Sequence, residues 1–166
     1  MKKLVAFYSR AGENYFGGSK KNIKIGNTEI VGKQIAEMVG ADLFKIDQVV
    51  PYSDNYNTCI LEAKYDLENH VRPNLKNTIE NMDEYDEIYL GYPNYWGKMP
   101  MAVYTFLEKY DFSGKKIHPF CTHEGSSLSS TVSDIQNLVP DAQVTKGLAI
   151  LGSHANDCLD ELKGWI

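Results

Sequence analysis

The sequence predicts one α/β domain with a parallel sheet of five strands and helices on both faces. Short runs of β-branched and aromatic residues alternate with longer segments of helical period, which is the pattern of repeated strand, helix, strand units. The short runs are almost continuously apolar, as expected of strands that are covered on both sides. A chain of 166 residues without repeat or linker can bury one such core, so we expect residues 1–166 to form a single domain.

Five segments have the composition of strands, with apolar β-branched or aromatic residues and few charges. They are residues 3–9, 42–46, 87–92, 116–122 and 143–150. Pro119 does not fit the fourth of these strands, because proline lacks the N–H group that a sheet requires. We therefore expect a bulge at Pro119 or a shorter strand.

Four segments between and after these strands repeat apolar residues at helical spacing. They are residues 31–39, 103–110, 128–139 and 158–165. The first ends at Gly40, which suits the left-handed residue that stops a helix, and the second follows Pro100, which is favourable in a first turn.

Two further segments are longer than a simple connection. Residues 53–70 read as a helix that either packs on the sheet or forms a wall of a substrate pocket, and packing on the sheet is the interpretation we favour. Residues 14–25 read as a small hairpin that closes near Gly17 and Gly18.

The net charge of −5 argues against binding to nucleic acid or to an anionic membrane surface. The longest apolar runs are far shorter than the roughly 20 residues of a membrane span, and residues 1–3 lead directly into a strand pattern. We therefore expect a cytoplasmic protein.

The cysteines and histidines show no metal-binding spacing. No C-x-x-C pair occurs, so the cysteines are expected to be buried thiols, and the scattered histidines predict no metal site. These residues are Cys59, Cys121, Cys158, His70, His118, His123 and His154.

The loop after the first strand has the groups that bind a phosphate. Ser9 follows the strand, and Asn27 and Thr28 precede a helix, so hydroxyl, amide and backbone N–H groups are available at a helix N-terminus. Taken alone, an ordinary helix cap is the commoner explanation of such residues. Neither G-x-x-x-x-G-K-[ST] nor G-x-G-x-x-G is present, which argues against a nucleoside-triphosphate or dinucleotide loop.

Two more loops follow strands three and four. Tyr95, Trp96 and Gly97 lie where an exposed loop should be polar, so the aromatic rings either fill a local core or lie against a planar ligand. "THEGSSLSS", residues 122–130, offers backbone and small side chains to the polar edge of a heterocycle, or caps the next helix. Ligands of open parallel sheets bind where the strands end, so these loops together indicate a mononucleotide with a large planar ring.

The segment "GYPNYWGKMPMAVYTFLEKYDFSGKKIHPFCTHEGSS", together with Ser9 and the helix start at residues 26–28, resembles the flavodoxin-like proteins that bind flavin mononucleotide (FMN). The resemblance implies a doubly wound sheet in the order 2-1-3-4-5. It also implies FMN phosphate in the first loop and the isoalloxazine ring between the second and third loops. The implied cofactor-binding residues are Ser9, Arg10, Ala11, Asn27, Thr28, Pro93, Asn94, Tyr95, Trp96, Gly97, Thr122, His123 and Gly125.

Within this set either Tyr95 or Trp96 stacks on the flavin, and we favour Trp96 because its ring is larger. We expect Gly97 to turn its carbonyl toward flavin N5. Residues 10–25 depart from the family pattern, in which the phosphate loop is short and contiguous. This insertion can shield the flavin or dock a partner. Its basic residues can offset the phosphate charge, but a solvated basic loop is the interpretation we favour. Those residues are Arg10, Lys20, Lys21 and Lys24.

Three functions are compatible with this pattern. The first, which we favour, is an FMN-binding electron-transfer protein that acts with redox partner proteins. The second is an oxidoreductase that takes hydride from a nicotinamide cofactor, NADH or NADPH, and reduces quinones or similar small acceptors. The third is a module that has lost its cofactor, and the intact loops argue against it.

Overall fold

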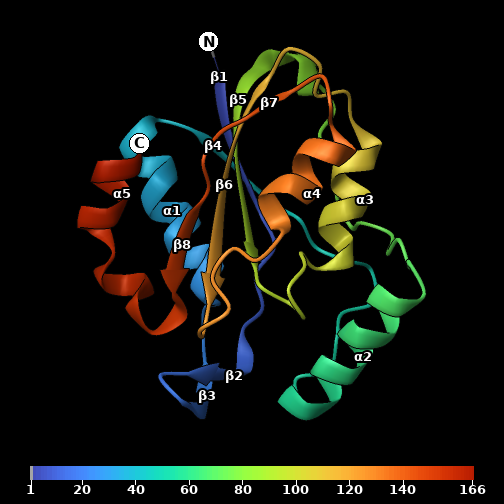
Figure 1. Cartoon of the computed structure of the whole chain (residues 1–166), viewed down its shortest axis with the longest axis vertical. Coiled ribbons are helices and arrows are strands. Elements are labelled where there is room, and N and C mark those ends of the chain that lie inside the picture. The colour runs from blue at the N-terminus through green and yellow to red at the C-terminus, as the bar shows by residue number, and fades with distance from the viewer. Residues whose placement is uncertain (1) are drawn as a thin grey trace.

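A parallel sheet forms the centre of the computed structural model, which describes residues 2–166. Its strand order is β4-β1-β5-β6-β7, and β8 also pairs with β6 (Figure 1). In chain order this is the predicted 2-1-3-4-5 arrangement, with the fifth strand in two pieces. The strands are β1 Lys2–Phe7, β4 Asp42–Lys45, β5 Tyr85–Pro93, β6 Lys116–His123, β7 Gln143–Val144 and β8 Leu148–Leu151.

Our expectation of a bulge or a shorter strand at Pro119 is wrong, and the break in the fifth strand explains why. Strand β6 pairs with β5 in an unshifted register from Glu87↔Lys116 to Pro93↔Thr122, so it has neither a bulge nor a premature end. The carbonyl of Ile117 accepts from Thr145 N–H at 2.9 Å, and alternate residues of a strand face the same neighbour. The nitrogen of Pro119 therefore faces the gap between β7 and β8, where no ladder donor is needed.

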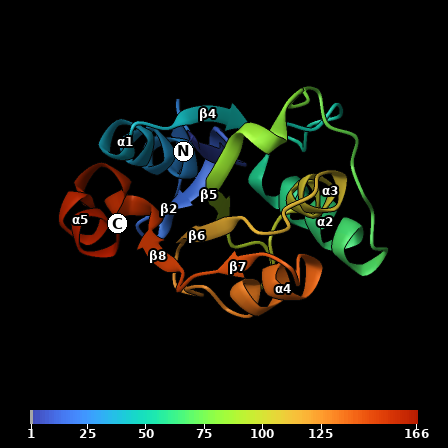
Figure 2. The same ribbon diagram turned by 90° about the horizontal axis from the view of Figure 1, so that it is seen from above.

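Helices cover both faces of the sheet, as predicted (Figure 2). On one face Val31 of α1 and Leu162 of α5 are buried in an apolar cluster with Val5 of β1. On the other face α3 and α4 bury Phe106 and Ile135 in a second apolar cluster. The helices are α1 Asn27–Val39, α3 Met101–Lys109, α4 Thr131–Leu138 and α5 Leu159–Trp165, and short 3₁₀ helices are η1 Met82–Glu84 and η2 Gly152–Asp157.

The ends of these helices follow local backbone chemistry. Gly40 ends α1 with a φ of 69°, and α3 begins directly after Pro100, as the sequence predicts. Helix α4 begins three residues later than predicted, because Ser127 and Ser129 adopt φ values of 55° and 49° that a helix does not accommodate.

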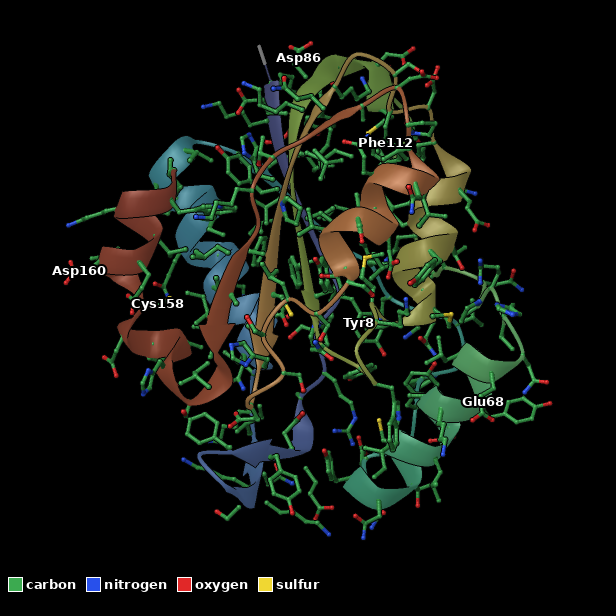
Figure 3. The ribbon with its side chains drawn as sticks, viewed as in Figure 1. Tyr8, Glu68, Asp86, Phe112, Cys158 and Asp160 are labelled. Atoms are coloured by element: carbon green, nitrogen blue, oxygen red, sulfur yellow. The ribbon has the colours of Figure 1, made fainter. Side chains whose placement is uncertain are left out.

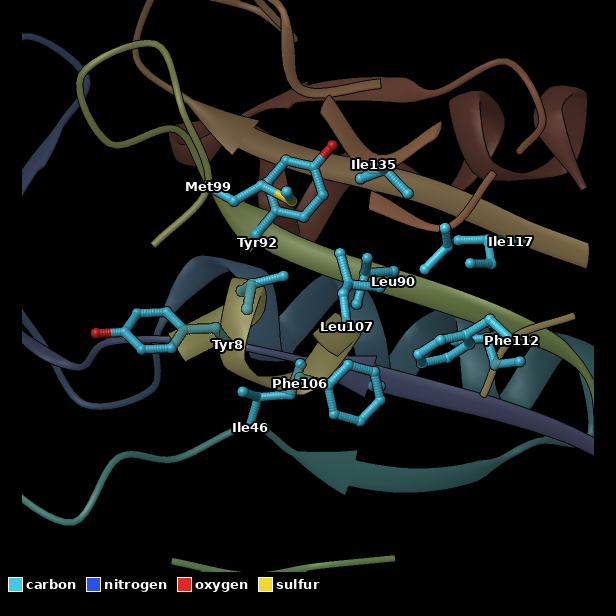
Figure 4. Packing of buried hydrophobic residues seen from close by; sticks show 14 of the residues in the cluster. Tyr8, Ile46, Leu90, Tyr92, Met99, Phe106, Leu107, Phe112, Ile117 and Ile135 are labelled. Carbon is cyan, nitrogen blue, oxygen red and sulfur yellow. The ribbon is translucent and has the colours of Figure 1, made fainter. Parts of the chain in front are cut away.

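The larger apolar cluster extends to the carboxyl ends of the strands. Leu90 and Tyr92 of β5 pack beside Phe106, and Tyr8 lies at the end of this row (Figure 4). The hydroxyl of the buried Tyr92 donates to Thr131 Oγ1 at 2.8 Å, so the phenol is satisfied inside the core. The carboxyl ends of β1 and β5 are therefore packed into the same apolar cluster as the rest of this face.

Helix α2, Tyr56–Glu68, and the hairpin of β2, Gly12–Phe16, and β3, Ser19–Ile23, lie beyond this edge (Figure 1). The hairpin agrees with the prediction. The favoured interpretation of α2 is wrong, because α2 packs against α3 and β2 rather than on the sheet. Its apolar face is weak: only Cys59 and Ala63 of this helix are buried.

The cysteines Cys59, Cys121 and Cys158 are buried free thiols, as predicted. Between Lys2 and Ile166, none of the helices combines the length and the apolar character that a bilayer crossing requires.

Candidate functional site

A cavity of about 470 Å³ lies at the carboxyl edge of the sheet. Its walls come from the three predicted loops, from the hairpin and from α2, and Figure 3 shows the last two on either side of the region beyond the strands. Ala11 and Gly125 do not line the cavity. The predicted residues that do are Ser9, Arg10, Asn27, Thr28, Pro93, Asn94, Tyr95, Trp96, Gly97, Thr122 and His123.

The start of α1 is built around a close approach of Ser9 to Gly26. A Cβ atom at Gly26, the N-cap, would lie 2.1 Å from Ser9 Oγ and 2.8 Å from the carbonyl oxygen of Arg10. Ser9 Oγ accepts from Glu29 N–H at 3.1 Å and so caps the helix from a distant position. Within residues 2–166, the N–H groups of Asn27 and Thr28 have no acceptor, so two first-turn donors are available to an anion.

A hydrogen bond joins the first loop to the third, and Gly152 lies close to both loops. The hydroxyls of Thr28 and Thr122 form a hydrogen bond of 2.7 Å, and both side chains are almost fully buried. Gly152 allows a second approach, since a Cβ atom there would lie 2.5 Å from Asn27 Nδ2 and 2.8 Å from Glu124 Oε1. The two loops therefore form one polar corner of the cavity.

The second loop is a tight turn from Tyr95 to Lys98. These two residues exchange backbone hydrogen bonds of 2.8 and 3.0 Å, and Trp96 and Gly97 have φ values of 55° and 78°, which is a type I′ geometry. Turning the Gly97 carbonyl, as we predict, must break the bond from Lys98 N–H to the Tyr95 carbonyl.

Asn94 holds this turn against the third loop. Its Oδ1 accepts from Gly97 N–H at 2.9 Å, and its Nδ2 donates to the Ser127 carbonyl at 2.9 Å and to Ser129 Oγ at 3.0 Å. All the polar atoms of the Asn94 side chain are thus used within the protein. Asn94 positions the two loops relative to each other.

Trp96 and Tyr95 occupy different environments. The Trp96 indole is half exposed, and its Nε1–H donates to the Ile60 carbonyl of α2 at 2.9 Å. Lys64 Nζ lies 5.2 Å from the centre of the indole ring, which adds a cation–π contact. Tyr95 packs edge-on against Tyr8, with 6.0 Å between ring centres, and burial raises its pKa well above the ordinary value. Trp96 is therefore the more accessible ring.

The third loop contributes two titratable residues. Gly125 N–H donates to His123 Nδ1 at 2.9 Å, and burial lowers the pKa of His123, so the neutral ring is favoured. Burial raises the pKa of Glu124, although the N–H of Gly17 donates to its Oε2 at 3.3 Å and acts in the opposite direction. The Gly17 contact brings the tip of the hairpin to the third loop.

The base of the hairpin is attached to α2. Glu13 Oε1 accepts from Tyr56 N–H at 2.8 Å, and the rings of Tyr15 and Tyr56 meet edge to face at 5.0 Å. The inserted hairpin and α2 thus form one wall of the cavity. The individual lining residues of this wall were not predicted from the sequence, although aromatic residues in polar segments were a signal. They are Asn14, Tyr15, Tyr56, Cys59, Ile60 and Ala63. Three lining residues of other segments were also not predicted individually: Glu124, Ser126 and Gly152.

The basic residues of the insertion differ in their position relative to the cavity, which Arg10 lines and the lysines do not. The guanidinium of Arg10 donates to the carbonyl oxygens of Glu13, Ser53 and Asp54. The three lysines are exposed and do not line the cavity, because they lie on the outer strand and the end of the hairpin. They are Lys20, Lys21 and Lys24. This agrees with the favoured interpretation of a solvated basic loop.

Comparison with known families agrees with this fold. A model of the flavodoxin family matches residues 2–166, which is the whole described chain. The chain belongs to the flavodoxin family. An uncharacterized protein of Methanocaldococcus jannaschii is 30% identical over 132 residues, covering 80% of this chain and 67% of that protein.

Solved structures share the flavodoxin-family architecture. Proteins of Bacteroides eggerthii and Bacteroides uniformis are 25% and 26% identical to this chain, each with a TM-score of 0.75. The alignments cover 98% of both chains for the first, and 99% and 96% for the second. A flavoprotein of Lactobacillus acidophilus, crystallised in complex with FMN, is 17% identical, with a TM-score of 0.67 and coverage of 93% and 96%, and supports the fold alone.

Proposed function

We propose that this member of the flavodoxin family binds FMN in the cavity and transfers electrons to and from redox partner proteins in the cytoplasm. The observation that carries the proposal is the combination of free donors at the start of α1 with the accessible Trp96 indole in one cavity. The donors suit a phosphate and the indole suits a planar ring. A crystal structure of a Lactobacillus relative contains FMN, which agrees with the proposal.

The residues present fit FMN in three places. Ser9, Asn27 and Thr28 are assigned to the phosphate, because their hydroxyl and backbone groups surround the start of α1. Trp96 is assigned to one face of the ring, and the backbone of the third loop, from Thr122, to its polar edge. Bound FMN supplies the ability to accept one or two electrons, and the protein supplies orientation and exclusion of water.

A second candidate function is supported by α2. Because Tyr56, Cys59, Ile60 and Ala63 line the cavity, the site has a partly apolar wall that the three loops do not provide. Such a wall can hold a small flat substrate, as required of an enzyme that oxidises NADH or NADPH and reduces a quinone. Loss of the cofactor is disfavoured by the size of the cavity and by its free donors.

An anaerobic titration of the FMN-loaded protein separates these functions. Electrons are added stepwise with dithionite while the visible spectrum is recorded, and the titration is repeated with NADPH and with NADH. We expect a stable one-electron-reduced flavin, which identifies an electron carrier. Direct two-electron bleaching by a nicotinamide would identify the enzyme instead, and absence of FMN binding would reject both functions.

A further inference from the structure

Arg10 carries a positive charge at the wall of the cavity, and the structure holds it firmly there. Its Nη2 donates to the carbonyl oxygens of Ser53 at 2.7 Å and Asp54 at 2.9 Å, and its Nη1 donates to the carbonyl of Glu13. These contacts fix the base of the hairpin to the segment that precedes α2. The Nε atom is buried and has no hydrogen-bond partner within residues 2–166.

Arg10 has no direct ion pair. Among residues 2–166, no Asp or Glu oxygen lies within 4.0 Å of its guanidinium nitrogens, and its hydrogen-bond partners are neutral carbonyl groups. Carboxylates on the neighbouring segments accept from backbone N–H groups: Glu13 from Tyr56, and Glu62 from Ser53. They keep their negative charge, and Glu62 raises the pKa of Cys59 where Arg10 lowers it. The Asp54 side chain approaches Gly12 instead, and Glu124 accepts from the hairpin tip at Gly17.

The field of this cation extends over one side of the cavity. Burial raises the pKa of four surrounding groups, and in each of them Arg10 acts in the opposite direction, because a nearby cation favours the ionised form. These groups are the phenols of Tyr8, Tyr56 and Tyr95 and the thiol of Cys59. Three of the four line the cavity. Arg10 itself lines the cavity, so its charge lies in the same wall as these groups.

We propose that Arg10 raises the reduction potential of FMN in this cavity by holding a positive charge without a direct ion pair at the cavity wall. The inference rests on the proposed function, since it requires FMN in the cavity. When FMN takes up two electrons and one proton, the flavin gains one negative charge. A fixed cation in a partly buried site stabilises that charge more than water does, because the effective dielectric constant is lower.

The test compares charge-removing and charge-keeping variants by anaerobic dithionite titration with a reference dye at pH 8. We expect Arg10→Met to weaken binding of reduced FMN about tenfold more than binding of oxidised FMN, which lowers the two-electron potential by about 30 mV. Arg10→Lys keeps the charge and should retain most of the potential. Lys20→Met removes an exposed charge outside the cavity and serves as the matched control.

A second variant allows the same measurement if Arg10→Met does not fold. Arg10→Gln removes the charge but keeps an amide donor for the carbonyl groups, so it can replace Arg10→Met if circular dichroism shows that protein to be unfolded. An unchanged potential in either folded variant, or an equal shift in Lys20→Met, would overturn the assignment of Arg10. Failure of the unaltered protein to bind FMN would reject the proposed function instead, because the potential could then not be measured in any variant.

Discussion

At the scale of single residues, Trp96 shows how a side chain can be both accessible and fixed. The indole N–H donates to the Ile60 carbonyl at 2.9 Å, so helix α2 sets the orientation of the ring. A planar ligand then stacks on a surface that has already lost much of its conformational entropy, which favours binding. The positive φ of 55° at this residue is stabilised by the turn that Tyr95 and Lys98 close.

Replacing Trp96 with alanine should weaken FMN binding by about 1–3 kcal/mol, which is the usual contribution of stacking between a base and an aromatic side chain. Dissociation constants can be measured from the change in flavin fluorescence. Tyr65→Ala is a suitable control, because Tyr65 is exposed on α2 and lies outside the cavity. Equal affinities of Trp96→Ala and the unaltered protein would show that the indole does not contact the flavin.

At Gly26 the addition of a single methyl group should lower both stability and FMN binding. In Gly26→Ala the new methyl group would meet Ser9 Oγ at 2.1 Å and backbone atoms of Arg10 at 2.8 and 2.9 Å, and the backbone atoms cannot rotate away. We expect a loss of about 1–3 kcal/mol in the free energy of unfolding and strongly reduced FMN binding. Urea denaturation and flavin fluorescence test the two effects separately.

The control for this substitution is Gly164→Ala in α5, where a Cβ atom meets nothing within 4 Å. Alanine is favoured over glycine in a helix, so this change should be neutral or slightly stabilising. A Gly26→Ala protein as stable as Gly164→Ala would contradict the steric explanation.

At the scale of elements, the inserted hairpin closes one side of the cavity. It is attached to α2 through Glu13 and Tyr56 and to the third loop through Gly17 and Glu124. The contact at the tip is a single long hydrogen bond of 3.3 Å, whereas the base has several contacts. The hairpin is therefore held mainly at its base.

Replacing residues 12–24 with a short glycine-serine linker should leave the sheet intact, because the hairpin forms a separate two-stranded unit. FMN should dissociate faster, and iodide should quench the bound flavin more strongly, since one wall has been removed. Stopped-flow dissociation and iodide quenching measure these effects. An unchanged dissociation rate would assign the hairpin to a role outside the cavity.

The strand and helix patterns predicted the order of elements well, because each core strand and helix has a strong apolar pattern of its own. The position of α2 could not be predicted in the same way: it buries only Cys59 and Ala63, so its local sequence does not define a partner. The continuous β6 was also missed, because the nitrogen of Pro119 is accommodated by a gap in a different strand. The role of Arg10 depends on carbonyl groups more than 40 residues away, which local sequence does not reveal.

At the scale of the whole molecule, a titratable group far from the cavity also affects stability. His118 lies on β6, away from the cavity, and stacks on Tyr89 with 4.5 Å between ring centres. Burial lowers the pKa of His118, and this effect exceeds the opposing one of Glu87, whose carboxylate lies 3.4 Å from Nε2. The folded protein therefore resists protonation of this ring.

The lowered pKa of His118 makes the free energy of unfolding depend on pH. An unfolded histidine has a pKa of about 6.5, so below that pH the unfolded state binds a proton that folded His118 resists. The free energy of unfolding should fall as the pH decreases from about 7 to 5, and His118→Gln should make this dependence shallower. His123, whose pKa burial also lowers, should retain part of it.

Urea denaturation at a series of pH values tests this prediction, with the exposed His70→Gln as the control. The slope in His70→Gln should match that of the unaltered protein. A slope that His118→Gln leaves unchanged would show that other groups determine stability in this pH range.

The central claim is that the carboxyl-edge cavity binds FMN through its phosphate as well as through its ring. The most direct measurement is a titration of the flavin-free protein with FMN and, in parallel, with riboflavin, which lacks the phosphate, followed by flavin fluorescence. We predict one FMN per chain and affinity for FMN at least about tenfold higher than for riboflavin, because hydrogen bonds to a charged group contribute about 1.5–3 kcal/mol each. Equal affinities, or no binding of either flavin, would contradict the account.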